Sequence, residues 1–332
     1  MKQLFLKKRH LADEYVQGIL NGDRVMLSKA ITLVESKLNA DNELAEDVLG
    51  KALPYTGNSV RIGITGVPGA GKSTFIESFG KCLTSTGKRV AVLTIDPSSQ
   101  KTKGSILGDK TRMEELANDP NAYVRPSPSG ATLGGVHSRT RETMLLCEAS
   151  GFDVIIIETV GVGQSETSVK GIVDFFLLLM LSGAGDELQG IKRGIMEMAD
   201  LIAINKTDGD NIKRSQLAQQ EYRNALHMFP SNENGWYPKV VTCSARNNTG
   251  IRETWEIICK HEEVMKANGF FKINRQQQNL QWMHDVIRDH LQNSFYNNGP
   301  VKKNLNYLKQ EVETEKIPAI VAAKRLLGLF LK

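Results

Sequence analysis

Residues 66–74 have the sequence Gly66-Val67-Pro68-Gly69-Ala70-Gly71-Lys72-Ser73-Thr74. This stretch lies between a β-rich run at 60–65 and a helix-like run that begins at Thr74. It matches the pattern of a glycine, four further residues and then Gly-Lys-Ser/Thr, and it has the strand-then-helix context that the pattern requires. The spacing therefore predicts a phosphate-binding loop.

Each residue type in this loop suits phosphate chemistry. Gly66, Gly69 and Gly71 permit backbone angles and close approaches that a Cβ would forbid, so successive N–H groups and the helix N-terminus can surround a β-phosphate. Lys72 adds a positive charge for the β- and γ-phosphates, and the Ser73 hydroxyl can ligate Mg²⁺. A glycine-rich turn in an unrelated α/β protein would not need the lysine and the hydroxyl together. The predicted nucleotide-binding residues are Gly66, Pro68, Gly69, Ala70, Gly71, Lys72, Ser73 and Thr74.

From residue 59 to about residue 246, short β-rich runs alternate with helical stretches. Several of the runs are apolar without alternation, which is typical of central strands covered by helices on both faces. The pattern predicts an α/β fold of the P-loop NTPase type, with a doubly wound, mainly parallel sheet and ligands at the carboxyl ends of its strands. The predicted strands are 61–65, 90–95, 122–125, 154–158, 175–181, 201–205 and 240–243.

Purely helical periodicity flanks this core on both sides. We predict an N-terminal helical extension at 1–55, a P-loop core at 56–250 and a C-terminal helical region at 251–332. The last segment, 317–331, has a strongly apolar face that suits either bracing of the core or a dimer interface. The predicted C-terminal helices are 251–268, 276–297, 301–315 and 317–331.

The composition is that of an ordinary soluble globular protein. The net charge of +5 over 332 residues is spread along the chain and forms no nucleic-acid-binding arm. The longest apolar run, 175–181, is far shorter than the about 20 residues needed to cross a bilayer. We therefore expect no nucleic-acid or membrane partner, and a cytoplasmic location, because the widely spaced cysteines fit neither a zinc site nor a disulfide framework. These are Cys82, Cys147, Cys243 and Cys259.

The choice of base depends on Asn205-Lys206-Thr207-Asp208, which follows the apolar run at 201–204. The Asp208 carboxylate can accept hydrogen bonds from both the ring N–H and the exocyclic amine of guanine, whereas adenine would leave it unpaired. Lys206 can lie along the base plane, and Asn205 can tie this loop to the phosphate loop. A polar strand end followed by a turn is the alternative. Backbone N–H groups that could meet the guanine oxygen belong to Ser244, Ala245 and Arg246. GTP and GDP are therefore the predicted ligands.

Magnesium needs a few hard oxygen ligands, with waters completing the shell. Ser73 offers one such oxygen. Asp96 and Glu158 each end a predicted strand, where their carboxylates could bind the ion or its waters. Either acid could instead cap the turn that follows it.

Three glycine-containing segments, 104–112, 158–166 and 182–192, are candidate switches, because their N–H groups could bond a γ-phosphate only while it is present. The first contains a further acid, Asp109. Transfer of a phosphoryl group to water depends mainly on positioning and charge neutralisation, which Lys72 and Mg²⁺ could supply. Gln164 is a candidate for orienting the water, although an ordinary surface glutamine fits as well.

Together these motifs resemble the MeaB/ArgK family of GTPases. The resemblance implies a dimeric GTPase that acts as a chaperone for adenosylcobalamin-dependent methylmalonyl-CoA mutase or a close acyl-CoA mutase relative, gating cofactor delivery and protecting the enzyme. By position it implies metal or catalytic roles for Ser73, Asp96, Asp109 and Glu158, a base-reading role for Asp208 and a third switch with Asp186 and Lys192. Lys103 stands where the family usually has a second glycine, which bears on the mobility of the first switch. The segments that carry the resemblance are 66–74, 96–99, 104–113, 125–129, 140–143, 158–166, 183–192 and 205–208.

Two other functions stay open at this point. The ArgK name implies a kinase that phosphorylates a transport protein, but no acceptor-binding module or catalytic-loop aspartate motif is evident. A nickel metallochaperone GTPase is the other, but the sequence lacks a Cys/His metal-transfer motif.

Overall fold

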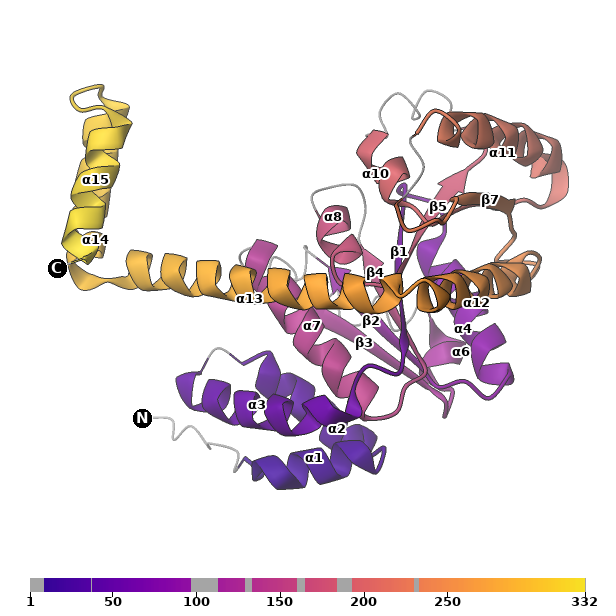
Figure 1. Ribbon diagram of the computed structural model, residues 1–332, viewed down its shortest axis with the longest axis horizontal. Helices are drawn as coiled ribbons and strands as arrows, with labels where there is room; N and C mark the ends of the chain where they lie inside the picture. The colour runs from indigo at the N-terminus through magenta and orange to yellow at the C-terminus, as the bar shows by residue number, and fades with distance from the viewer. Residues whose placement is uncertain are drawn as a thin grey trace. The chain divides into compact units, whose positions relative to one another are not determined.

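The computed structural model describes residues 9–36, 38–96, 113–128, 133–159, 165–183, 193–229 and 233–331 (Figure 1). The chain forms two compact units, Met1–Gln278 and Asn279–Lys332. The first unit contains the sheet and the second contains only helices among its described residues. The division into three parts drawn from the sequence stays a prediction.

A seven-stranded sheet with the order β3-β2-β4-β1-β5-β6-β7 is the centre of the first unit. Each pair of neighbouring strands is parallel. The chain places β2, β3 and β4 on one side of β1 and β5, β6 and β7 on the other, so the strand order reverses at β1 and opens a ligand position beyond its carboxyl end. All seven predicted strands are confirmed, as β1 Val60–Gly66, β2 Val90–Asp96, β3 Ala122–Pro128, β4 Val154–Thr159, β5 Phe175–Leu181, β6 Leu201–Asn205 and β7 Lys239–Thr242.

Helices cover both faces of the sheet. On one face α4 (Lys72–Ser85) contacts α6 (Glu114–Ala117) and α12 (Ile251–Ala267). On the other, α8 (Ser165–Lys170) contacts α7 (Leu133–Ala149) and α10 (Arg193–Met198). Right-handed crossovers between parallel strands explain this division, since movement along the sheet in opposite directions places the helices on opposite faces. A further helix, α11 (Ile212–Leu226), packs against β6 and β7.

The core consists largely of side chains from the sheet and α4 that are fully buried. Every residue of β4 and β6 is buried, which explains the apolar runs 154–157 and 201–204 before their polar last residues. Phe75 and Phe79 lie one turn apart on α4 and stack with their ring centres 5.6 Å apart, and Phe79 meets the Trp255 ring of α12 at 6.2 Å. Each buried phenylalanine contributes about 1.5–3 kcal/mol, so this aromatic row anchors the helix that follows the phosphate loop.

The N-terminal extension folds into α1 (Ala12–Leu20), α2 (Arg24–Val34) and α3 (Asn39–Ala52), which pack on one another and on α7 (Figure 1). Asp23 starts α2 by accepting hydrogen bonds from the backbone N–H groups of the next turn. The Arg125 side chain of β3 reaches Glu35 at 2.5 Å, and Tyr123 shares a hydrogen bond of 3.0 Å with Ser28. Because β3 is an edge strand, these contacts cover an edge that could otherwise pair with another chain.

A network of buried charges lies at the amino ends of β1 and β5. Arg61 donates two hydrogen bonds of 2.9 Å to Glu148 of α7, and Arg275 of α13 donates to both oxygens of Asp174 at 2.8 and 2.7 Å. Burial alone would raise the pKa of Glu148, but the hydrogen bond and charge of Arg61 hold it below its ordinary value. Since each ion has an opposite charge in contact, the network satisfies groups whose burial would otherwise be costly.

The largest difference between the predicted and observed C-terminal helices is the start of the second one. Gly269 adopts a φ of 77° and ends α12, and the Asn268 side chain accepts from the Phe270 N–H at 2.9 Å. The next helix therefore starts at once, as α13 (Phe270–Asn297), six residues before the predicted start at 276. The remaining helices, α14 (Gly299–Glu313) and α15 (Ala319–Phe330), pack on each other around Val301, Leu308, Ala322 and Leu326. Within the described part of the chain, no helix is both long and apolar enough to cross a membrane.

Candidate functional site

The phosphate loop joins β1 to α4, as the sequence predicted. Gly66, the last residue of β1, is required by close packing, because a Cβ there would lie 2.3 Å from the Leu179 carbonyl oxygen of β5. Gly71 is the N-cap of α4 and has a φ of 81°, in the left-handed region that favours glycine. The open first turn of α4 therefore presents its backbone N–H groups at the sheet edge, where an anion would be stabilised.

Lys72 lies across this loop. Its Nζ atom donates to the Gly66 carbonyl at 3.0 Å, so the ammonium group is held over the residues that precede it. A neutral carbonyl is a modest partner for a full positive charge, and an incoming phosphate oxygen would be a stronger one.

Ser73 and Glu158 meet at the ends of two adjacent strands. The Ser73 hydroxyl donates to Glu158 Oε1 at 3.2 Å. Glu158 is buried, with only 6% of its surface exposed. Beside them, the hydroxyl groups of Thr65 and Thr159 are 2.8 Å apart. The parallel register pairs Ile64 of β1 with Glu158 of β4, which explains why the acid reaches the first turn of α4.

The predicted metal ligands are brought together only in part among the described residues. Asp96 ends β2, which pairs with β4 at Ile95 and Thr159, so its backbone lies at the neighbouring strand end. Asp109, Gln164 and the third-switch residues 186 and 192 lie outside the described residues, as does 103. A hydroxyl and a carboxylate in contact form a hard-oxygen pair that fits Mg²⁺. Within the described ranges there is no group of three or more His, Cys, Asp or Glu residues that could hold a metal by itself.

Asn205, at the end of β6, connects the two predicted nucleotide loops. Its buried side chain donates from Nδ2 to the Ala70 carbonyl at 2.8 Å and accepts at Oδ1 from the Ala245 N–H at 3.1 Å. The Cys243 thiol also approaches Oδ1, at 3.7 Å. The predicted contact between the base loop, residues 205–208, and the phosphate loop, residues 66–74, is confirmed. Asn205 also contacts the loop after β7.

The carboxylate of Asp208 is held by the loop after β7. Ser244 Oγ donates to Asp208 Oδ2 at 2.5 Å and accepts from the Asn247 N–H at 3.2 Å. Two residues before Asp208, Lys206 adopts a left-handed backbone conformation with a φ of 61°. Asn211 Nδ2 donates to the Lys206 carbonyl at 2.8 Å. These contacts fix one oxygen of Asp208 and the course of the chain that presents it.

Two positioning contacts have no counterpart in the sequence prediction. Ser78, in the second turn of α4, donates to the Ala245 carbonyl at 2.6 Å, and Asn211 donates to the Lys206 carbonyl as described above. A serine in a helix and an asparagine in a turn are too common to carry a motif, so no pattern in one sequence would identify them.

The three motifs therefore converge at the carboxyl ends of β1, β6 and β7. Pro68, Gly69, Thr74, Lys206 and Arg246 are exposed, while Asn205, Ser244 and Ala245 are buried beneath them. This arrangement can present N–H donors and a lysine to phosphates and a carboxylate to a base.

Comparison with known proteins finds similar proteins over most of the chain. The model of the family described as methylmalonyl Co-A mutase-associated GTPase MeaB matches residues 27–299. GTPase ArgK of Escherichia coli strain K12 is 48% identical over 285 residues, covering 86% of this chain and 86% of that protein. A Mus musculus protein named methylmalonic aciduria type A homolog, mitochondrial, is 44% identical over 334 residues, covering 98% of this chain and 80% of that one. A crystal structure of a LAO/AO transport system kinase has a TM-score of 0.78 and 38% identity, covering 97% of this chain and 98% of its own.

Proposed function

The chain belongs to the MeaB family of GTPases, and from this membership we propose that its GTP cycle gates the loading of adenosylcobalamin into methylmalonyl-CoA mutase or a related acyl-CoA mutase and protects that enzyme. The chain is a GTPase, which converts GTP and water to GDP and phosphate. The family match carries the proposal, because it spans most of the chain and the family description names the mutase as associate. In this proposal, hydrolysis changes the conformation of the chain, and the partner enzyme binds the two conformations differently.

We propose that the base is read by Asp208, which accepts from guanine while Ser244 holds its other oxygen. Lys206 lies along the base, and the backbone N–H group of Arg246 faces the guanine oxygen. The predicted N–H groups of Ser244 and Ala245 do not, because they already donate to the Thr249 carbonyl and to Asn205 Oδ1. The Asn205 contacts at 2.8 and 3.1 Å support this assignment, since they place both loops at a fixed separation from the phosphate loop.

In the proposed hydrolysis, Lys72 exchanges its Gly66 carbonyl partner for phosphate oxygens and neutralises charge that develops there. Glu158 is near enough to Ser73 to hold waters at the same edge. Asp109 and Gln164 complete the proposed catalytic group, with Gln164 assigned to the attacking water.

Mg²⁺ would be held by Ser73 together with Asp96, Asp109 and Glu158, directly or through water. When bound, the ion supplies positive charge beside the phosphate oxygens. The Ser73–Glu158 contact of 3.2 Å supports this choice of donors.

The partner proposal is tested by gel filtration of the full chain with an adenosylcobalamin-dependent methylmalonyl-CoA mutase, with GDP or with a non-hydrolysable GTP analogue. We expect a complex whose amount depends on the nucleotide. Asp208→Ala is the matched control, because it should keep the fold and lose the nucleotide dependence at the same concentration. Absence of a complex in both nucleotide states would contradict the proposal.

The kinase named for the similar crystal structure is the second candidate function. It differs in the acceptor of the γ-phosphate, which would be a protein side chain in place of water. Incubation with γ-labelled GTP and a LAO/AO transport protein separates the two functions. Label released as inorganic phosphate supports the GTPase chaperone, and label bound to the transport protein supports the kinase.

We also propose that the protein is a homodimer joined through α13. The exposed residues Leu280, Met283, Ile287 and Leu291 recur at spacings of three or four and so form one apolar helix face. Each is 48–58% exposed in the single chain, and a second copy of the same helix would cover the face symmetrically. Sedimentation should give a dimer for the natural chain and a monomer for Ile287→Glu. A monomer for both would reject the interface.

A cytoplasmic location completes the proposal. The four cysteines are free thiols, which suits a reducing compartment.

A further inference from the structure

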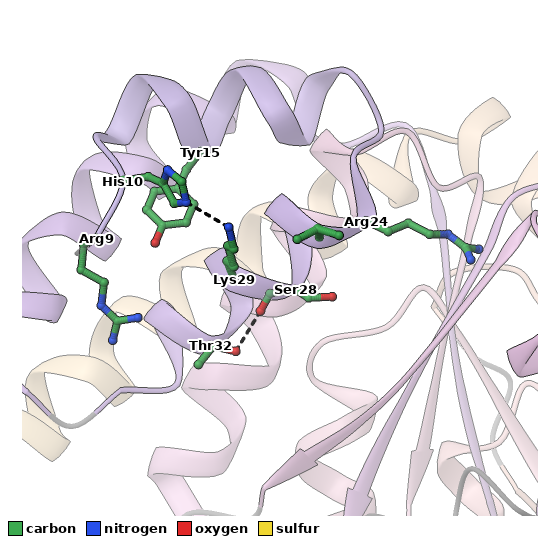
Figure 2. A pocket seen from close by; sticks show the side chains of 8 residues that line it. Arg9, His10, Tyr15, Arg24, Ser28, Lys29 and Thr32 are labelled. Carbon is green, nitrogen blue, oxygen red and sulfur yellow. Dashed lines mark hydrogen bonds between the residues drawn. The ribbon is translucent and has the colours of Figure 1, made fainter. Parts of the chain in front are cut away.

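A cavity of about 700 Å³ lies among the N-terminal helices, away from the nucleotide motifs. Its lining comes from residues 9–10, from Tyr15 of α1 and from α2 (Figure 2). Its size falls within the range of small-molecule sites. The helices around it pack beside β3, whereas the base-reading loops follow β6 and β7 at the other side of the sheet. We propose that this cavity binds a small organic anion, a phosphate or carboxylate attached to an apolar group.

The lining is positively charged. Arg9, Arg24 and Lys29 are the cationic residues of the lining, and none of the eight lining residues is acidic. The Arg9 guanidinium is already paired with Asp41, at 2.9 and 2.6 Å. Arg24 donates instead to main-chain carbonyls, including that of Pro120 at 3.0 Å, and Figure 2 shows its guanidinium pointing away from His10 and Lys29. The positive charge that a ligand in the cavity could neutralise is therefore that of Lys29.

Lys29 is the side chain best placed to bind the anion. Its Nζ atom lies 3.0 Å from His10 Nε2, and Figure 2 shows the two side chains pointing toward each other. Because an ammonium group has donors and no acceptor, the imidazole must accept through a neutral Nε2, which leaves the proton on Nδ1, 3.5 Å from Glu14 Oε2. Among the described residues, no carboxylate lies within salt-bridge distance of Lys29. Its remaining N–H donors and its whole charge are available to a ligand.

The rest of the cavity offers an apolar wall on a fixed frame. The Tyr15 ring packs edge-on against His10 with the ring centres 5.4 Å apart, and Val25 is 61% exposed at the rim. Ser28 is held by Tyr123 of β3 at 3.0 Å, and the Thr32 hydroxyl donates to the Ser28 carbonyl at 2.8 Å. These contacts fix α2, so the charged group and the apolar wall keep their separation before a ligand arrives. An anion with an aromatic or aliphatic part matches both features.

The test uses the full chain saturated with GDP and Mg²⁺, so that the phosphate loop is already filled. Phenyl phosphate is titrated by calorimetry, with benzoate and inorganic phosphate as further probes. We expect one phenyl phosphate site per chain and at least about tenfold weaker binding in Lys29→Gln, since a charge-assisted contact is lost. Lys303→Gln, on the exposed side of α14, is the matched control and should bind as the natural chain does.

Equal affinity in Lys29→Gln and the natural chain, or no heat with any probe, would overturn the proposal. Inorganic phosphate binding as tightly as phenyl phosphate would overturn the role of the apolar wall. Comparison of phenyl phosphate with benzoate assigns the anionic group. GDP affinity, measured in the same preparations, keeps this result separate from the nucleotide site.

Discussion

The two ends of the central sheet use charged residues in opposite ways. At the amino ends of β1 and β5, Arg61 and Arg275 meet carboxylates, each through a pair of hydrogen bonds of 2.7–2.9 Å. At the carboxyl ends, two charged groups have hydrogen bonds to neutral partners. Lys72 donates to a carbonyl, and Asp208 accepts from a serine hydroxyl.

This difference separates stability from function. An ion paired with an opposite ion in a buried site has little to gain from a ligand, and its partner loses much when it is removed. A charge that contacts a hydroxyl or a carbonyl can exchange that contact for a ligand group with a gain. We therefore expect substitutions at the amino ends to alter unfolding, and substitutions at the carboxyl ends to alter nucleotide chemistry.

Arg275→Ala should produce the largest effect. It leaves the buried Asp174 without its cation, so we expect the free energy of unfolding to fall by about 3–5 kcal/mol in urea titrations. The control is Arg252→Ala on α12, which removes an exposed ion pair with Glu256 and should cost less than about 1 kcal/mol. An equal fall in the free energy of unfolding in both variants would show that the buried ion pair stabilises the fold no more than the exposed one.

Lys72→Ala should lower the turnover number and leave the free energy of unfolding unchanged. Loss of a positioned charge at the reacting phosphate is expected to lower the turnover number by about 10²–10³-fold. Phosphate release measured under saturating GTP checks the rate, and a urea titration should match that of the natural chain. Turnover at the natural rate would place the phosphate site elsewhere.

Asp208→Ala should have an intermediate effect on the base end. Guanine would lose charge-assisted hydrogen bonds, so we expect GDP to bind more weakly by about 1.5–3 kcal/mol. Ser244→Ala leaves the carboxylate and removes the hydroxyl that orients it, with an expected loss of about 0.5–1.5 kcal/mol. Calorimetry with GDP and ADP gives both values. Unchanged GDP affinity in Asp208→Ala would refute the base assignment.

The smallest change should be the part of acid destabilisation that comes from Glu148, at the amino end. Glu148 has a folded pKa below its ordinary value of 4.5, so its stabilisation is complete above that pH and is lost as the pH falls through the folded pKa. Urea midpoints measured from pH 7 to pH 3 should fall more steeply for the natural chain than for Glu148→Gln. Parallel curves for the two proteins would contradict this linkage.

Much of this architecture could be predicted because it has a local signal. Buried parallel strands are continuous apolar runs, and the phosphate loop and the Asn205–Asp208 loop are short motifs. The tie through Asn205 followed from the chemistry of an amide, which has both a donor and an acceptor. Asp109 and Gln164 lie outside the described residues, so their roles stay predictions.

The contacts that sequence reasoning missed are those between distant residues of ordinary type. Arg275 and Asp174 are 101 positions apart, and Ser78 and Ala245 are 167 apart. No periodicity or spacing links such pairs, because only the packing of α13 and α4 on the sheet brings them together. The cationic cavity was missed for the same reason, since Arg9, Arg24 and Lys29 are unremarkable surface residues in the sequence.

In the proposed nucleotide site, Asn205 links the two loops that would bind the phosphates and the base. Through its bonds to Ala70 and Ala245, the phosphate and base subsites stand at a set span, so the second half of the nucleotide binds at a high effective concentration once the first is in place. Guanosine or pyrophosphate alone gains nothing from that span. The buried Asn205 amide thus favours binding of the intact nucleotide over its fragments, although we assign it no contact with the base or the phosphates.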